Sequence, residues 1–288
     1  MSRVGFVTHP RRAAAVDTTM WLDRLLSADG VETVRLPDDG HRPHEGADGL
    51  DLVVSVGGDG TFLRAAFASS DAGCPVLGVK VGRLGFLTEV EPEGAPELIW
   101  SVLRGEAAIE ERLALTVEPV DGGDFEPQWG LNEIMVEKHA RHRLVRLAVH
   151  VDGSYVTTFS ADGVIVASPT GSTAYSFSAR GPIVSPRVES LVLTPVAPHM
   201  VFDRSFVLAP ESQVCLEVVG EESGLLSADG RQSIELPVGA EVLIRASARP
   251  ARLVRRAGAS GFLELVREKF DLPGDDPSSP SGDVGDAG

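Results

Sequence analysis

The fold of the first part of the chain follows from one stretch, Val53-Val54-Ser55-Val56-Gly57-Gly58-Asp59-Gly60-Thr61-Phe62-Leu63-Arg64. A β-branched run over 52–56 is typical of a strand buried in a parallel sheet, and a helix is predicted over 61–68. Three glycines near the junction let a ligand approach the backbone closely, and the N–H groups of such a turn point outward together. The stretch therefore predicts an anion-binding turn at the end of a buried strand.

Strand and helix patterns alternate on both sides of this turn. Strands are predicted over Val4–Val7, Glu32–Leu36 and Val76–Val79, and helices over Ala13–Leu26 and 96–104. Such alternation is typical of a parallel sheet with helices on both faces. We therefore predict an α/β domain over residues 1–112, which carries the Gly-Gly-Asp-Gly loop.

The pattern becomes β-rich after Arg112. Strands are predicted over Leu113–Val117, Gly130–Val136, Leu144–Val151, Tyr155–Phe159, Val164–Ala167, Ser190–Val196, Val214–Val218, Leu225–Ser227 and Glu241–Ala246. Turn signals such as Asp152-Gly153 and Asp229-Gly230 separate several of them. We predict a β-rich domain over 113–250, a strand and a helix over 251–270, and a ligand cleft between the two domains.

Composition argues against several classes of protein. The 288 residues are 43% hydrophobic, yet no apolar run approaches the roughly 20 residues that cross a bilayer. A formal net charge of −16 argues against a nucleic-acid binder. Two distant cysteines, Cys74 and Cys215, and the absence of signal-peptide features favour the cytoplasm. Residues 271–288 carry five Asp and no Lys or Arg, which predicts a disordered acidic tail.

The acidic residue inside the anion-binding turn needs an explanation. Asp59 would repel phosphate unless it accepts a proton from an attacking hydroxyl or holds a divalent metal between phosphates. The alternative is an ordinary Asp-Gly turn, in which its carboxylate accepts local N–H groups. The next predicted strand runs into a second glycine-spaced turn, Gly78–Leu87, which taken alone is equally consistent with a simple tight connection.

A polar loop distinguishes the β-rich domain, within Asp162-Gly163-Val164-Ile165-Val166-Ala167-Ser168-Pro169-Thr170-Gly171-Ser172-Thr173-Ala174-Tyr175-Ser176-Phe177-Ser178. Short hydroxyl side chains suit a purine edge, Tyr175 can stack on a base, and Asp162 can accept a hydrogen bond from an exocyclic amine. The alternative is a Ser/Thr turn that starts a helix, with Ser172 or Thr173 as its N-cap.

Two further polar features are weaker by themselves. The pair Asn132-Glu133 suits a ribose diol, since the amide can donate and the carboxylate can accept, but a surface position is the default interpretation. Asp229 precedes Gly230 and is first of all a turn residue, and only second a ligand contact.

Together these motifs resemble the bacterial NAD kinase family, whose members use ATP or polyphosphate. The family's Gly-Gly-Asp-Gly-Thr loop stands at 57–61, its Asn-Glu pair at 132–133, and its Asp-Gly followed by Pro-Thr-Gly-Ser-Thr-Ala-Tyr-x-x-Ser at 162–178. The resemblance covers about residues 1–270. It implies a β-sandwich-like second domain, a chain end that returns toward the first domain, and phosphorylation of the adenosine-ribose 2′-hydroxyl of NAD⁺ to give NADP⁺.

The resemblance also implies roles for individual residues. Asp59 would act on the 2′-hydroxyl as the catalytic residue, and the donor phosphates would contact Gly57, Gly58, Gly60 and Thr61. The NAD⁺ contacts would be Asp59, Gly60, Arg64, Asn132, Glu133, Arg143, Asp162, Thr173, Ala174, Tyr175, Ser178, Asp229 and Gln232.

The same resemblance implies the cofactors and partners. The donor would be ATP, or for some members polyphosphate or another nucleoside triphosphate. Mg²⁺ or another divalent metal would accompany it near Asp59, without a fixed protein metal site. Family members form homodimers or homotetramers, in which a neighbouring subunit completes the NAD site, and neither nucleic acid nor membrane is a partner.

The chain departs from the family pattern at four positions. Ser160 stands where Arg is common, Lys80 where Asn is usual, and Arg180 where Gly is usual. Arg231 displaces the Gln that often follows Asp229, which leaves Gln232 or Arg231 in its place. These departures bear on donor preference, on affinity and on the choice between NAD⁺ and NADH.

Two other functions are consistent with the motifs. A lipid or sphingoid-base kinase shares a similar Gly-Gly-Asp-Gly-Thr turn, but the Thr170–Ser178 loop with Asn132-Glu133 suits a nucleotide better than an acyl chain. A catalytically weak paralogue would bind NAD(H) as a sensor; the departures at Ser160, Lys80 and Arg180 favour it, and the retained Asp59 argues against it.

Overall fold

The computed structural model describes residues 1–37, 48–82, 85–120, 123, 125–256, 258 and 261–273. The chain divides into two compact units, Met1–Ala257 and Gly258–Gly288. The second unit contains α5 (Phe262–Lys269), at whose start Glu264 accepts a hydrogen bond of 3.0 Å from the Gly261 N–H. Of the predicted acidic tail, residues 274–288 lie outside the described residues. None of the described helices is long and apolar enough to cross a membrane.

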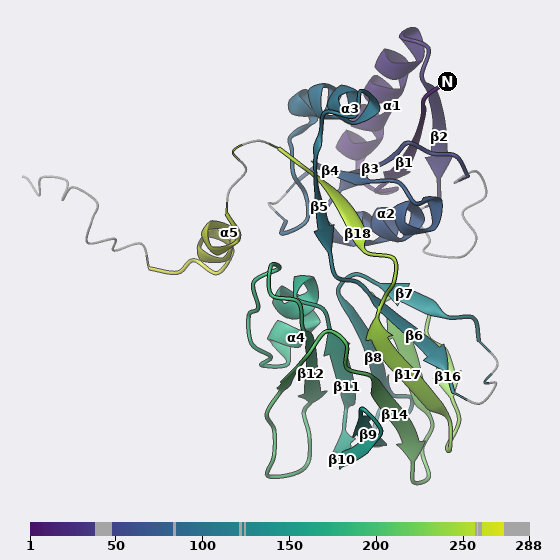
Figure 1. Ribbon diagram of the computed structural model, residues 1–288, viewed down its shortest axis with the longest axis vertical. Helices are drawn as coiled ribbons and strands as arrows, with labels where there is room; N and C mark the ends of the chain where they lie inside the picture. The colour runs from purple at the N-terminus through teal and green to yellow at the C-terminus, as the bar shows by residue number, and fades with distance from the viewer. Residues whose placement is uncertain are drawn as a thin grey trace, which may run out of the picture. The chain divides into compact units, whose positions relative to one another are not determined.

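A six-stranded mixed sheet forms the first lobe of the larger unit, which we call the α/β lobe (Figure 1). Its strands, in spatial order, are β2 (Glu32–Leu36), β1 (Arg3–Thr8), β3 (Leu52–Gly57), β4 (Val76–Lys80), β18 (Ala251–Arg255) and β5 (Ala108–Arg112). Neighbouring strands are parallel except β18 and β5, which are antiparallel. The predicted parallel sheet is therefore mixed at one edge, where β18 comes from the far end of the chain.

Helices cover both faces of this sheet, and its central strand β3 is therefore buried on both sides. Leu52, Val54 and Val56 of β3 pack with α1 (Ala13–Ala28) and α3 (Ala95–Leu103), whereas Val53 packs with α2 (Asp59–Ala72). A short 3-10 helix, η1 (Pro92–Gly94), precedes α3. Burial on both faces accounts for the unbroken β-branched run in the sequence.

The second lobe, which we call the β lobe, is a sandwich of two antiparallel six-stranded sheets. One sheet has the order β10 (Ser154–Ala161), β9 (Val145–Val151), β14 (Val214–Val219), β17 (Glu241–Ala246), β6 (Leu115–Pro119) and β7 (Gln128–Gly130). The other has β13 (Phe206–Leu208), β12 (Leu191–Val196), β11 (Gly163–Ala167), β8 (Glu133–Lys138), β15 (Gly224–Ala228) and β16 (Ile234–Leu236). Their apolar faces meet in one core, in which every second residue of β14 is buried.

The two lobes share an apolar core. Trp129 of β7 and Leu131 are fully buried in the cluster that α2 forms against the mixed sheet. The rings of Trp129 and Phe67 stack with centroids 6.3 Å apart, and the indole N–H donates to the Arg249 carbonyl at 2.9 Å. The guanidinium of Arg231, from the β lobe, lies 3.9 Å from the centroid of the Phe67 ring, which belongs to α2.

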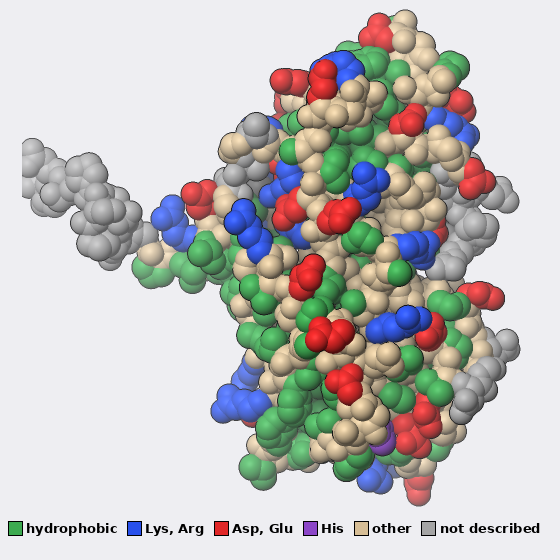
Figure 2. All heavy atoms as spheres, viewed as in Figure 1, with side chains coloured by type: hydrophobic (Ala, Val, Ile, Leu, Met, Phe, Trp, Pro, Cys, Tyr) green, Lys and Arg blue, Asp and Glu red, His purple; other side chains and the backbone are tan. Residues whose placement is uncertain are grey.

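One apolar surface of the β lobe lies beside the edge strand β13. Val201 is fully exposed, Val207 is 58% exposed, and Phe202 packs against Phe206 with ring centroids 5.2 Å apart. Figure 2 shows hydrophobic side chains gathered on the part of the β lobe that carries β12, the neighbour of β13. Patches of this kind often mark interfaces.

The structure divides one predicted strand and adds three that were not predicted, β5, β13 and β16. The strand predicted over Gly130–Val136 is wrong in extent, because β7 ends at Gly130 and β8 begins at Glu133. Asp229 causes the break, since its carboxylate accepts hydrogen bonds from the backbone N–H groups of residues 131 to 133. Strand β5 was not predicted, because its charged sequence, Ala108-Ile109-Glu110-Glu111-Arg112, lacks a strand pattern.

Candidate active site

The predicted anion-binding turn joins β3 to α2 at the carboxyl edge of the mixed sheet. Gly57 ends β3, and a Cβ there would lie 2.7 Å from Oγ1 of the buried Thr61, so only glycine fits. A Cβ at Gly58 would meet no atom of the described residues within 4 Å, so this glycine faces open space. A Cβ at Gly60 would lie 4.0 Å from Nη1 of Arg64. The backbone at positions 58 and 60 is thus accessible to a ligand.

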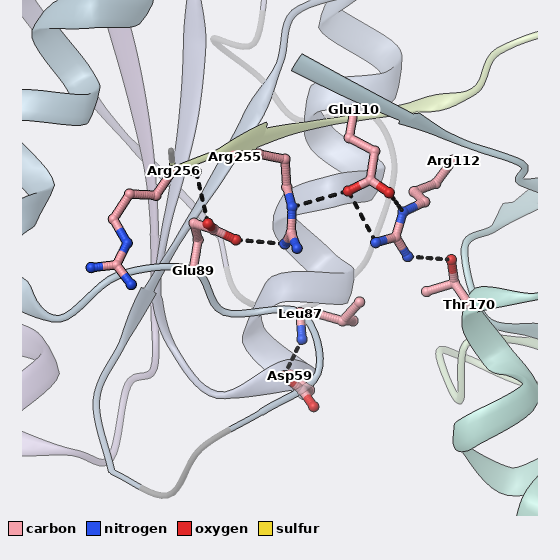
Figure 3. Close-up of polar contacts among 8 residues, drawn as sticks. All are labelled: Asp59, Leu87, Glu89, Glu110, Arg112, Thr170, Arg255 and Arg256. Atoms are coloured by element: carbon pink, nitrogen blue, oxygen red, sulfur yellow. Dashed lines mark hydrogen bonds and ion pairs between the residues drawn. The ribbon is translucent and has the colours of Figure 1, made fainter. Parts of the chain in front are cut away.

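Asp59 begins α2, and the second glycine turn holds its carboxylate. The N–H groups of Phe86 and Leu87 donate to its two oxygens at 2.9 and 3.1 Å (Figure 3 shows Leu87). A Cβ at Gly85 would overlap Oδ1 of Asp59, so the turn packs directly on the carboxylate. A carboxylate has about four acceptor positions, and the described residues use two of them. Asp59 is therefore fixed in orientation and keeps acceptor positions for the hydroxyl group of a ligand.

A hollow of about 640 Å³ lies beside the turn. It is lined by Arg12, Ala13, Ala14, Gly58, Val81 and Gly82. The guanidinium of Arg12 donates to the Val81 carbonyl at 2.5 Å, and α1 and α2 both begin at this hollow. Helix N-termini and a guanidinium favour an anion. Sequence reasoning missed Arg12, although a basic residue soon after a strand of a parallel sheet was the available signal.

The pair Asn132-Glu133 lies at the bend between β7 and β8, and Asp229 shapes that bend. Asp229 accepts the N–H groups of Leu131, Asn132 and Glu133 at 2.8, 2.8 and 3.1 Å, in a left-handed conformation with φ of 50°. Asp229 therefore supports the backbone of the Asn132-Glu133 pair through its carboxylate. Burial, despite Arg231 and these N–H groups, raises the pKa of the Asp229 carboxyl.

The side chains of the pair have polar atoms that the rest of the described chain does not satisfy. Oδ1 of Asn132 and Oε2 of Glu133 are both buried, and no hydrogen-bond partner lies near them among the described residues. Burial, with a smaller contribution from the nearby Asp229, raises the pKa of Glu133 to about 8. Buried unpaired acceptors are costly, and hydroxyl donors of a ligand would satisfy both.

The polar loop follows β11 and forms the 3-10 helix η2 (Thr170–Thr173) and the one-turn helix α4 (Tyr175–Ser178). Ser168 donates to the Leu131 carbonyl at 2.5 Å, and a Cβ at Gly171 would overlap the Asn132 carbonyl oxygen. The loop therefore packs against the bend that carries the Asn-Glu pair. Tyr175 is 43% exposed, which leaves its ring available for stacking. The structure brings Asn132, Glu133 and residues 170–178 together.

Three other predicted contact residues lie elsewhere in the β lobe. Asp162 and Arg143 lie at the end of β8 opposite to Glu133, where Asp162 pairs with Lys138 at 2.5 Å and Arg143 with Glu222 at 3.7 Å. Gln232 is exposed between β15 and β16. Arg143 and Asp162 therefore lie at the other end of β8 from the Asn-Glu pair.

The structure shows the surroundings of each position that departs from the family pattern. Lys80 pairs with Glu91 at 2.5 Å. Arg180 has φ of 68°, the left-handed conformation that glycine favours. Arg231 contacts the Trp129 carbonyl and the Phe67 ring, so it holds the two lobes together. Ser160 lies opposite Arg146 in the β10–β9 pair.

The described residues near the turn offer a single carboxylate, that of Asp59, to a divalent metal. No cluster of three or more His, Cys, Asp or Glu side chains in the described part of the chain is arranged to hold an ion. Mg²⁺ commonly uses only one or two carboxylates together with phosphate oxygens. Asp59, with acceptor positions left, fits such a role.

Comparisons with known proteins agree with the geometry. Residues 41–107 match the ATP-NAD kinase N-terminal domain, and residues 131–256 match the ATP-NAD kinase C-terminal domain. An NAD kinase of Rhodococcus opacus (strain B4) is 39% identical over 295 residues, covering 93% of this chain and 92% of the relative.

Solved structures of similar fold are also known. An NAD kinase from Archaeoglobus fulgidus in complex with ATP is 28% identical, with a TM-score of 0.74, and covers 94% of this chain and 99% of its own. Yeast NADH kinase complexed with NADH has a TM-score of 0.84 over 97% of this chain and 90% of its own. At 23% identity it shows the fold alone.

Proposed function

The chain belongs to the ATP-NAD kinase family, and from this premise we propose that it transfers the γ-phosphoryl group of ATP to the adenosine-ribose 2′-hydroxyl of NAD⁺. The observation that carries the proposal is the Asp59 carboxylate. It is fixed by two amides at the start of α2, next to a hollow edged by a guanidinium and two helix N-termini.

In the proposed reaction the hydroxyl oxygen forms the new bond to phosphorus, and the bond between that phosphorus and the β–γ bridging oxygen breaks, so that ADP leaves. Asp59 accepts the hydroxyl proton. The N–H groups of Phe86 and Leu87 hold its carboxylate in a fixed orientation for this transfer. The N–H groups of the turn and Arg12 stabilise charge on the phosphate oxygens. A divalent metal bound with ATP would neutralise further charge.

The NAD⁺ site in this proposal is the bend and the polar loop. Oδ1 of Asn132 and Oε2 of Glu133 would accept hydrogen bonds from ribose hydroxyls, which supplies the donors that these buried atoms lack within the described chain. Thr173, Ala174, Tyr175 and Ser178 would line the base pockets, with the exposed ring of Tyr175 as a stacking surface.

We further propose that the protein acts as a homodimer or homotetramer. Arg143 and Asp162 contribute to an NAD⁺ site only if they serve a neighbouring subunit, and the exposed apolar residues beside β13 support self-association. We place the reaction in the cytoplasm, a reducing compartment that suits the two free cysteines.

The test of the proposed function is Asp59→Asn, which keeps the size of the side chain. Purified protein is incubated with Mg²⁺, with ATP or polyphosphate, and with NAD⁺, NADH or a sphingoid base as acceptor, and the phosphorylated product is quantified. We expect NADP⁺ from the wild type, and a kcat in the variant lower by about 10²- to 10⁴-fold with NAD⁺ binding retained.

The matched control is Asp71→Asn. Asp71 lies near the end of the same helix and pairs with Arg249 at 2.8 Å, far along α2 from the turn. Its kcat should equal that of the wild type. Unchanged turnover in Asp59→Asn would remove Asp59 from the mechanism, and NAD(H) binding without any product would identify a sensor instead.

A further inference from the structure

A buried carboxylate lies two residues after the amides that hold Asp59. The Glu89 side chain is only 4% exposed and accepts a hydrogen bond from the Arg256 N–H at 2.7 Å. It also pairs with Nη1 of Arg255 at 2.5 Å. Burial raises the pKa of Glu89, against the opposing effect of these partners. Glu89 is therefore tied to the end of β18.

The contacts continue from Arg255 across β5 to the β lobe (Figure 3). Nε of Arg255 pairs with Glu110 at 3.0 Å, and Glu110 binds Arg112 through both carboxylate oxygens, at 2.8 and 3.1 Å. The buried guanidinium of Arg112 then donates to Oγ1 of Thr170 at 3.3 Å. We call the series Glu89–Arg255–Glu110–Arg112–Thr170 the ion chain.

The first end of the ion chain fixes the segment that holds Asp59. The Glu89 N–H donates to the Gly78 carbonyl at 2.8 Å, and a Cβ at Gly78 would lie 2.9 Å from the Leu87 carbonyl oxygen. Residues 86 and 87 are therefore held between the Asp59 carboxylate and an anchored Glu89. A displaced Glu89 would move the two amides that orient Asp59.

The other end fixes the polar loop. Thr170 is the first residue of η2, and its carbonyl accepts a hydrogen bond from Thr173 at 3.3 Å. The residues after it are those proposed to line the base pockets. The ion chain thus connects the support of the reactive carboxylate to the support of the dinucleotide.

The charges of the ion chain balance, since two carboxylates face two guanidiniums. A buried ion pair of this kind is weak evidence for stability, because apolar residues of similar volume often serve a core as well. Its distinctive property is geometry, since bidentate arginine–carboxylate pairs allow little freedom of orientation. The ion chain is therefore suited to hold the segments at its two ends in a fixed relative position.

We propose that the ion chain positions the Asp59 carboxylate relative to the loop 170–178, with Glu89 and Arg112 as positioning residues for phosphoryl transfer. The inference rests on the proposed function. It predicts that breaking the chain at either end lowers kcat while the KM values for NAD⁺ and ATP change little, because binding groups stay in place and only their alignment is lost.

The experiment is a double-mutant cycle with Glu89→Gln and Thr170→Val, measured by NADP⁺ formation. A misplacement of about 1 Å can cost about 10²-fold in rate, so we expect each variant to lose about tenfold or more in kcat. The double variant should lose little more than the worse single variant, because one break already uncouples the ends. Thr170→Ser, which keeps the hydroxyl, should restore the wild-type kcat.

The matched control is Glu118→Gln, which breaks an ion pair with Arg245 in the β lobe outside the ion chain. In the double variant Glu89→Gln/Glu118→Gln, the fold-change in kcat should equal the product of the fold-changes in the two single variants. Should Glu89→Gln fail to fold, Arg112→Lys, which keeps the charge and loses the bidentate contact, takes its place in the cycle. Effects of Glu89 and Thr170 that multiply, or that appear only in KM, would overturn the inference. A wild type without turnover would overturn the proposed function and this inference together.

Discussion

Replacement of Glu133 by Gln tests the electrostatics of the site without any assay of turnover. The pKa of Glu133 rises from 4.5 to about 8 because the carboxyl is buried and Asp229 lies nearby. Between these two pH values the unfolded chain has released the proton and the folded protein has kept it. Because the folded state then binds more protons, the free energy of unfolding falls as pH rises from about 4.5 to about 8.

The structure sets the size of this effect. Each tenfold change in acidity corresponds to roughly 1.4 kcal/mol, which gives a ceiling of about 5 kcal/mol above pH 8. We expect about 2 to 3 kcal/mol, because residue 133 as a whole is only partly buried, so that solvent screens part of the charge even though Oε2 itself is buried. Gln resembles the protonated acid in shape and has no charge to bury. Glu133→Gln should therefore match the wild type in stability near pH 4.5 and exceed it above pH 8.

The assay is urea unfolding of both proteins at pH 5 and at pH 8.5, with the free energy of unfolding extrapolated to water. Glu118→Gln is the control, because Glu118 lies in the β lobe paired with Arg245. Its difference from the wild type should not grow with pH. An equal difference between Glu133→Gln and the wild type at the two pH values would refute the reasoning.

Two other changes test the donor hollow and the packing of the polar loop. Arg12→Gln should raise the KM for ATP by about tenfold, the loss of one charge-assisted contact, and change the KM for NAD⁺ by less than about twofold; equal increases in both would remove Arg12 from the donor hollow. Gly171→Ala places a Cβ against the Asn132 carbonyl oxygen, so thermal unfolding should show a loss of about 1 to 3 kcal/mol, and an unchanged melting temperature would show that the loop does not pack as described.

Local patterns were sufficient for the frame of the fold. The β-branched run of β3, the glycine turn and α2 are contiguous, so sequence signals alone could place them. The α/β lobe and the β sandwich are confirmed by the structure, and the family by the comparisons. The roles of the site residues in binding NAD⁺ and ATP stay predictions.

The features that sequence reasoning missed depend on partners far along the chain. Asp229 interrupts the predicted strand although it lies 96 to 98 residues further along the chain. The sequence around Gly130 contains no signal that predicts this interruption. Strand β5 is charged because Glu110 and Arg112 take part in the ion chain, whose partner Arg255 lies at the other end of the lobe's sequence. Patterns within a window cannot report a charge that is neutralised by tertiary contact.

The indole of Trp129, buried under α2, limits how this protein can exclude water during catalysis. Many phosphotransferases swing one domain over the substrate. Here a comparable hinge would withdraw an aromatic side chain of roughly 150–250 Å² from apolar surroundings, which costs about 4 kcal/mol or more at ~25 cal/mol per Å². We therefore expect the two lobes to keep their relative orientation during catalysis, so that any exclusion of water comes from the substrates and the segments beside them rather than from a domain closure.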